Sequence, residues 1–158
     1  MNDKQLKEVE TRYYAAVKVY NELKYGRSGF VREAAEAAER KAEAEWDAQY
    51  GDSLKAASTV QAELSREYDE AKVLSASAKS SLAGKHVYQA TTERYSHKIV
   101  RYKEGIVEIA TPQTEVSGNR RRPSIGSEFV RLLKADGTPG LAFDTWMSGW
   151  TTKKPVIG

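Results

Sequence analysis

Apolar residues recur every three or four positions over the first two dozen residues of the chain. The positions between them hold mostly Lys, Glu, Arg and Asn, as expected of a solvent-exposed helix face. This spacing predicts a helix with a coiled-coil-like seam. The seam residues are Leu6, Val9, Tyr13, Ala16, Tyr20 and Leu23. The tetrapeptide Gly26-Arg27-Ser28-Gly29 follows the seam, and its two glycines predict a turn that ends the first helix.

A second helical stretch extends from Phe30 to Leu82 without a proline. Alanines dominate its first part, and large apolar residues then return at steps of three or four. This stripe consists of Trp46, Tyr50, Leu54, Ala57, Val60, Leu64, Tyr68, Ala71, Leu74, Ala78 and Leu82. Its unbroken phase indicates one long helix, whereas Gly51-Asp52-Ser53 has the residues of a helix stop followed by a new cap. Of the two interpretations we favour the break, which makes three helices.

The composition changes after Gly84, where Val, Ile, Thr and Tyr become frequent and turn signals recur at short intervals. This pattern is typical of small β folds. The expected strands lie near Val87–Tyr95, Lys98–Lys103, Ile106–Thr111, Glu128–Lys134 and Leu141–Trp146. We expect Lys103-Glu104-Gly105 to close a hairpin between the second and third strands. A long loop, residues 112–127, separates the third strand from the fourth, and the whole predicts a four- or five-stranded antiparallel sheet.

These elements predict an α+β chain with two regions. Residues 1–83 form a long-helix hairpin or a three-helix, coiled-coil-like arm, and residues 85–158 form a small antiparallel β module. An Ala-rich helix and a thin sheet bury little apolar surface, while ordering each residue costs on the order of 1–2 kcal/mol of entropy. Association of helices from several chains would supply the missing burial. The predicted oligomer interface consists of Leu6, Val9, Tyr13, Tyr20, Leu23, Trp46, Tyr50, Leu64 and Tyr68.

The composition limits the cellular setting. The chain has no cysteine, and no apolar run approaches the roughly eighteen residues needed to cross a bilayer. The N-terminal residues mix acids with bases and lack the apolar core of a secretory signal. We therefore expect a cytoplasmic or other intracellular protein, or part of a virion assembled there, with no membrane contact.

The sequence offers little for catalysis. Its two histidines, His86 and His97, both fall on predicted strands and have no metal-binding spacing. The sequence contains no HExxH, GxSxG, P-loop or GxGxxG motif. We therefore predict that the protein is not an enzyme, and we expect no cofactor, metal or small-molecule substrate.

Charge is distributed unevenly along the chain. Residues 1–84 carry 13 Lys and Arg against 15 Asp and Glu, a net charge of −2, whereas residues 85–158 carry 12 against 7, a net charge of +5. The sharpest basic signal is Arg120-Arg121-Arg122 in the long loop, because guanidinium groups bind phosphate and carboxylate in a bidentate manner. Lys153 and Lys154 extend this predicted contact patch, and Trp150 is available to stack on a base.

Two functional hypotheses follow. The leading one is a non-enzymatic oligomeric structural, assembly or protein-interaction protein, whose helices join subunits and whose β module docks a partner in a virion or another large complex. The alternative is a nucleic-acid-binding module that uses the Arg120–Arg122 loop and the basic β face. The affinity of such a module falls steeply with salt, because binding releases counterions from the phosphates.

Overall fold

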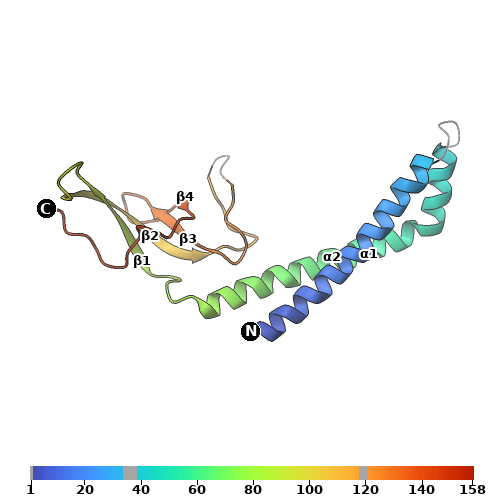
Figure 1. The fold of residues 1–158 in the computed structure, drawn as a ribbon, viewed down its shortest axis with the longest axis horizontal. Helices are drawn as coiled ribbons and strands as arrows, with labels where there is room; N and C mark the ends of the chain where they lie inside the picture. The colour runs from blue at the N-terminus through green and yellow to red at the C-terminus, as the bar shows by residue number, and fades with distance from the viewer. Residues whose placement is uncertain (1, 34–38, 118–120) are drawn as a thin grey trace. The chain divides into compact units, whose positions relative to one another are not determined.

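A computed structural model describes residues 2–33, 39–117 and 121–158. Two helices are followed by four antiparallel strands, which confirms the predicted α+β class (Figure 1). The chain divides into two compact units, which we call the hairpin unit, residues 2–71, and the sheet unit, residues 72–158.

Helix α1, Asp3–Glu33, is longer than the sequence predicts. Its N-terminus is capped reciprocally: the Gln5 backbone N–H donates to Asn2 Oδ1 at 2.9 Å, and the Asn2 backbone N–H donates to Gln5 Oε1 at 3.0 Å. The predicted turn at Gly26–Gly29 is wrong, because α1 continues through it to Glu33. Tertiary contacts outweigh the local signal: the Arg27 side chain bonds to Asp47 on the second helix.

Helix α2, Glu39–Lys79, passes without interruption through Gly51-Asp52-Ser53, so the predicted break there is also wrong. The phase of the apolar stripe was the better guide, because continuing the helix keeps the stripe on one face of α2 on both sides of the glycine. The alanine-rich start of the predicted second helix lies partly at residues 34–38, outside the described residues. The helix ends before Ser80, whose hydroxyl accepts the N–H groups of Leu82 and Ala83.

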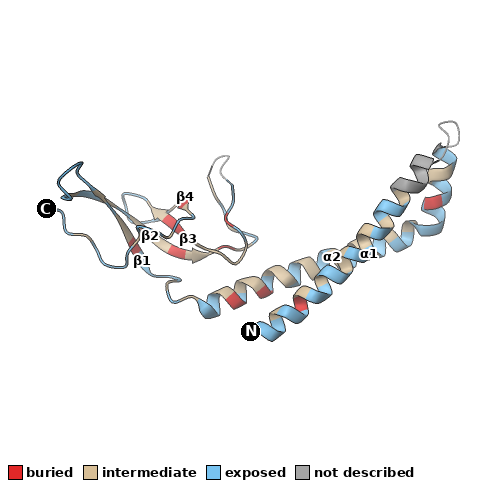
Figure 2. Cartoon of the chain, viewed as in Figure 1, coloured by how far each residue is buried: buried red, intermediate tan, exposed pale blue. Residues whose placement is uncertain are grey.

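Side-chain pairs show that α1 and α2, as far as Ala71, form an antiparallel hairpin (Figures 1 and 2). Arg12, near the start of α1, bonds to Glu67, far along α2. Arg27, near the end of α1, bonds to Asp47, in the first part of α2. Two helices of one chain therefore bury part of each other's apolar stripe.

The sheet unit contains strands β1 (His86–Thr92), β2 (Ile99–Ile109), β3 (Glu128–Leu133) and β4 (Pro139–Asp144). Each strand pairs antiparallel with the next, in the order β1-β2-β3-β4. Two of the five predicted strands are therefore one, and the predicted hairpin at Lys103-Glu104-Gly105 is wrong. The first hairpin joins β1 to β2 instead, and His97, predicted on a strand, lies in its loop.

Gly105 is a glycine because of packing. A Cβ atom at this position would collide with the Val130 side chain and would lie 2.9 Å from the Arg131 carbonyl oxygen and 3.5 Å from the Trp150 ring. The missing side chain lets Trp150 lie close to the middle of β2. The sequence predicts Gly105 as a turn residue, whereas the structure needs glycine there so that Val130 and Trp150 can approach the β2 backbone closely.

The sheet unit has apolar clusters on both faces of its sheet. Val87, Val107 and Val130 form one cluster, which Leu82, Leu132, Met147 and Trp150 cover. Ala110, Phe129 and Phe143 form the other, against which Val116 packs. Short chain segments also cover part of each edge: Thr151 pairs with Tyr88 beside β1, and the Ser117 N–H donates to the Leu141 carbonyl on β4.

Candidate interaction surfaces

A furrow lies between α1 and α2 in the hairpin unit. Its central part is a hollow of about 430 Å³ with mostly small apolar walls. The residues that line it are Ala16, Val19, Leu23, Ser53, Ala56, Ala57 and Val60. Val19 is 51% exposed and Val60 is 49% exposed, so apolar surface on both helices faces outward here. We call this part the small-residue furrow.

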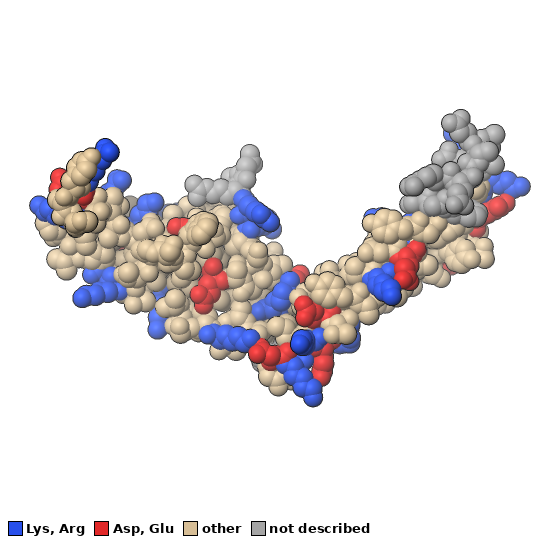
Figure 3. All heavy atoms as spheres, viewed as in Figure 1, with Lys and Arg blue, Asp and Glu red and all other residues tan. Residues whose placement is uncertain are grey.

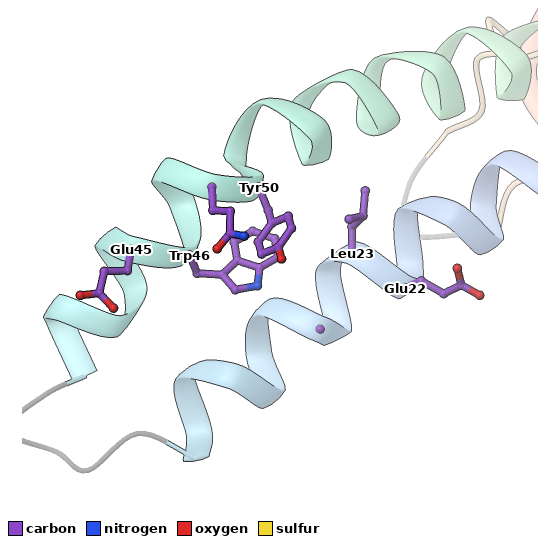
Figure 4. A pocket seen from close by; sticks show the side chains of 7 residues that line it. Glu22, Leu23, Glu45, Trp46 and Tyr50 are labelled. Carbon is purple, nitrogen blue, oxygen red and sulfur yellow. The ribbon is translucent and has the colours of Figure 1, made fainter.

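The furrow continues beyond Leu23 into a second hollow of about 450 Å³, which we call the aromatic end. Glu22, Leu23, Gly26, Glu45, Trp46, Gln49 and Tyr50 line it. Figure 4 shows Trp46, Tyr50 and Leu23 between the two helices, with the carboxylates of Glu22 and Glu45 to either side. The two aromatic ring centroids are 5.2 Å apart. The aromatic end is thus apolar at its base and acidic at its rim.

The predicted seam residues lie on the inner sides of the hairpin. Val9 and Trp46 are buried, Tyr50 is the most exposed, and the others are half-buried; these are Leu6, Tyr13, Tyr20, Leu23, Leu64 and Tyr68. Tyr13 stacks on Tyr68 across the hairpin, with ring centroids 5.2 Å apart. Their association between chains stays a prediction. Because the stripes already meet within one chain, the surface that the hairpin offers a partner is their outer flank, which includes the furrow.

Polar pairs also join the two helices. The Tyr68 hydroxyl donates to Glu10 Oε1 at 2.9 Å, and burial together with this carboxylate raises the pKa of Tyr68 to about 12. Near the other end of the hairpin, hydrogen bonding to Arg27 lowers the pKa of Asp47. These side chains are partly exposed, so they position the helices more than they stabilise them.

The structure separates the residues of the predicted basic patch. Arg120 lies outside the described residues, and Arg121 and Arg122 are exposed in the loop between β2 and β3, beyond the C-terminal end of β2. Lys154 instead lies 5.8 Å from the Tyr102 ring centroid, near the N-terminal end of β2. Figure 3 shows Lys and Arg side chains spread along the sheet unit.

The two remaining members of that prediction have different surroundings. Lys153 is exposed beside Lys154. Trp150 packs against the Val87 cluster, and its indole N–H donates to Asp144 Oδ2 at 3.2 Å. Its indole therefore serves the packing of the sheet unit.

Arg131 is a structural residue that sequence reasoning missed. It is only 7% exposed, and its guanidinium group binds Glu108, with Nη2 3.2 Å from Oε2. It also donates to the Glu115 and Gly140 carbonyl oxygens and lies over the Phe129 ring. This network joins the loop after β2 to the sheet. The available signal was an arginine inside the otherwise apolar run of β3.

Within the described ranges, no three His, Asp or Glu side chains lie close enough to hold a metal ion together. His86 Nδ1 lies 3.1 Å from Glu104 Oε1, as a pair. None of the described helices combines the length and the apolar character needed to cross a membrane.

The fold and its surfaces thus define an α+β protein with a furrowed helical hairpin and a small antiparallel sheet. Comparison of the chain with protein-family models, with curated proteins and with solved structures finds no match.

Proposed function

We propose that this protein is a non-enzymatic structural or interaction protein that assembles into an oligomer, with its helical hairpin as the element that joins the chains. The observation that carries the proposal is the furrow, an apolar strip that two packed helices leave open along one side. From Ala16 to Gly26 the furrow follows eleven residues of α1, and the ten steps between them span about 15 Å.

The physical argument concerns the surface that the hairpin leaves exposed. Two helices cover only one side of each other, and contiguous apolar surface left in water favours association. Ala16, Ala56 and Ala57 keep the walls low, so another polypeptide can approach the helix backbones closely. Val19 and Val60 then gain most from burial, since each now exposes about half of its side chain. A subunit of a large complex, a virion included, would suit this design.

The test places a charge on an exposed valine of the furrow and leaves the buried residues Val9 and Trp46 unchanged. We expect Val19→Glu and Val60→Glu to shift the molar mass of the assembly to that of the monomer, because association would bury an unpaired carboxylate. Light scattering on a sizing column, over a range of protein concentrations, measures the mass. Far-UV circular dichroism shows whether the helices persist.

Ala62→Glu is the matched control. It adds the same charge to the same helix at an exposed position that does not line the furrow, so the mass should stay that of the wild type. A wild-type chain that is monomeric at every concentration contradicts the proposal. So does a Val60→Glu variant that assembles as well as the control.

A further inference from the structure

The loop between β1 and β2 presents the most exposed large apolar side chain in the described part of the protein. Tyr95 is 90% exposed, and the guanidinium carbon of Arg94 lies 5.2 Å from the centroid of its ring. His97 and Lys98 follow after Ser96 and are also exposed. We call residues 94–98 the tip. An aromatic ring flanked by basic side chains is the composition of an interface anchor.

The backbone holds the tip in one shape. The Glu93 N–H donates to the Lys98 carbonyl at 2.7 Å, and the Ser96 hydroxyl donates to Glu93 Oε2 at 2.8 Å. Tyr95 has φ 77° and His97 has φ 54°, both in the left-handed region that disfavours large side chains. Strained positions of this kind concentrate at functional sites. A strained loop that projects a tyrosine into solvent therefore requires an explanation that the sheet itself does not supply.

The aromatic end of the furrow has the complementary chemistry. Tyr50, which is 40% exposed, offers ring surface to another aromatic side chain and to a cation, and the buried Trp46 ring packs beside it. The charged residues among those that line this hollow are Glu22 and Glu45. Each lies about 4 Å from a lysine one helical turn away, at 4.0 and 3.9 Å, in exposed pairs that a stronger partner can replace. Its volume of about 450 Å³ lies in the range of pockets that hold compact ligands.

The net charges of the two units also favour a contact between a hairpin unit and a sheet unit. Residues 2–71 carry 11 Lys and Arg against 15 Asp and Glu, a net charge of −4. Residues 72–158 carry 14 against 7, a net charge of +7. Two hairpin units repel each other, whereas a hairpin unit and a sheet unit from different copies attract.

We propose that copies of this chain associate head to tail, with the tip of one copy inserted into the aromatic end of the furrow of the next. Tyr95 contacts Trp46 and Tyr50, and the basic side chains of the tip face Glu22 and Glu45. The inference rests on the proposed function and identifies the partner as a second copy. Such a contact uses two different surfaces, so it produces a ring or an open chain of subunits.

Complementation between two variants tests the arrangement. Tyr95→Asn removes the ring and keeps a residue that tolerates the left-handed backbone, so the loop stays folded. Gly26→Leu fills the aromatic end from a helical position where an added Cβ meets no heavy atom within 4 Å. We expect each variant alone to lose roughly 30-fold or more in affinity for itself, the loss typical of an interface anchor. An equimolar mixture should form dimers and nothing larger, because each dimer retains one intact contact.

Tyr25→Asn is the control, since Tyr25 is an exposed tyrosine of the hairpin that lines neither hollow; this variant should assemble like the wild type. A charge exchange gives a second measurement: Arg94→Glu should weaken association, and mixing it with a Glu22→Arg, Glu45→Arg chain should restore assembly, because both contacts between the two kinds of chain then join opposite charges. The proposal is overturned if Tyr95→Asn assembles like the wild type, or if the two monomeric variants fail to pair. Either result leaves the furrow as an assembly surface with another occupant, whereas a wild-type chain that never associates removes the proposed function itself.

Discussion

Replacing Gly26 and Gly51 with alanine tests the helical hairpin directly, because the sign of the effect depends on the backbone. In the structure both glycines lie inside helices, at Asp3–Glu33 and Glu39–Lys79. An added Cβ meets no heavy atom within 4 Å at Gly26, and at Gly51 its nearest neighbour is Asp47 Cβ at 3.9 Å. Glycine in a helix interior is less stable than alanine by about 1 kcal/mol. Each substitution should therefore stabilise the hairpin unit.

Neither added methyl group has the other site among its neighbours within 4 Å, so their effects should add to about 2 kcal/mol. Urea unfolding followed by far-UV circular dichroism measures this change. With a denaturant slope of about 1 kcal/mol/M for a unit this small, the midpoint of the double variant should rise by about 2 M. Measurement at several protein concentrations separates this effect from association.

Gly137→Ala is the matched control. An added Cβ there also meets no heavy atom within 4 Å, but the residue has φ +83° in the turn between β3 and β4. Only the backbone differs, and the left-handed conformation should cost about 1–2 kcal/mol, measured by tryptophan fluorescence. If Gly26→Ala and Gly51→Ala also lower the unfolding midpoint, both glycines are helix stops, and the three-helix alternative replaces the hairpin.

Three further substitutions test the packing. Arg131→Met leaves the Glu108 carboxylate without its partner, and we expect the free energy of unfolding in urea to fall by about 3 kcal/mol. Adding Glu108→Gln should recover part of this loss. An equal loss in the single and the double variant would contradict the Arg131–Glu108 pair. The pKa of Tyr68 is raised from 10.0 to about 12, so the folded hairpin keeps a proton that the unfolded chain releases. Its stability should fall as pH rises between those values, and Tyr68→Phe should remove that part of the pH dependence. Gly105→Ala should cost about 1–3 kcal/mol because the new methyl group collides with Val130; an unchanged unfolding midpoint would show that β2 and β3 are not packed as described.

The order of helices and strands was predictable because periodicity survives in both units. The steps of three and four from Leu6 to Leu23 and from Trp46 onward identify helices whatever covers them. Glycine misled the prediction at Gly26, Gly51 and Gly105. A glycine signals the absence of a side chain, and only the packed structure shows whether that absence permits a turn, as at Gly137, or a close approach, as at Gly105.

The interaction surfaces were harder to predict than the fold. The stripe identified Trp46 and Tyr50, but a stripe does not show whether its partner belongs to the same chain. The small-residue furrow depends on which alanines of two helices face the same side, and that is known only once the helices are paired. Tyr95 was assigned to a strand, since nothing in the sequence signals a left-handed tyrosine. The arginines of the long loop were predicted to form a contact patch only because three of them are consecutive.

The surfaces that the protein buries and those that it leaves exposed also support the proposed head-to-tail contact. The sheet buries apolar clusters on both faces, and Thr151 and Ser117 bond to its two outer strands, so extension of the sheet by another chain is disfavoured. In the hairpin, the inner stripes are already paired. The surfaces that the described residues leave exposed include a furrow with an acidic rim on one unit and a basic aromatic tip on the other. Their chemistry differs too much for a symmetric contact and matches well enough for one surface to receive the other, which is why we propose assembly in one direction over simple pairing of helices.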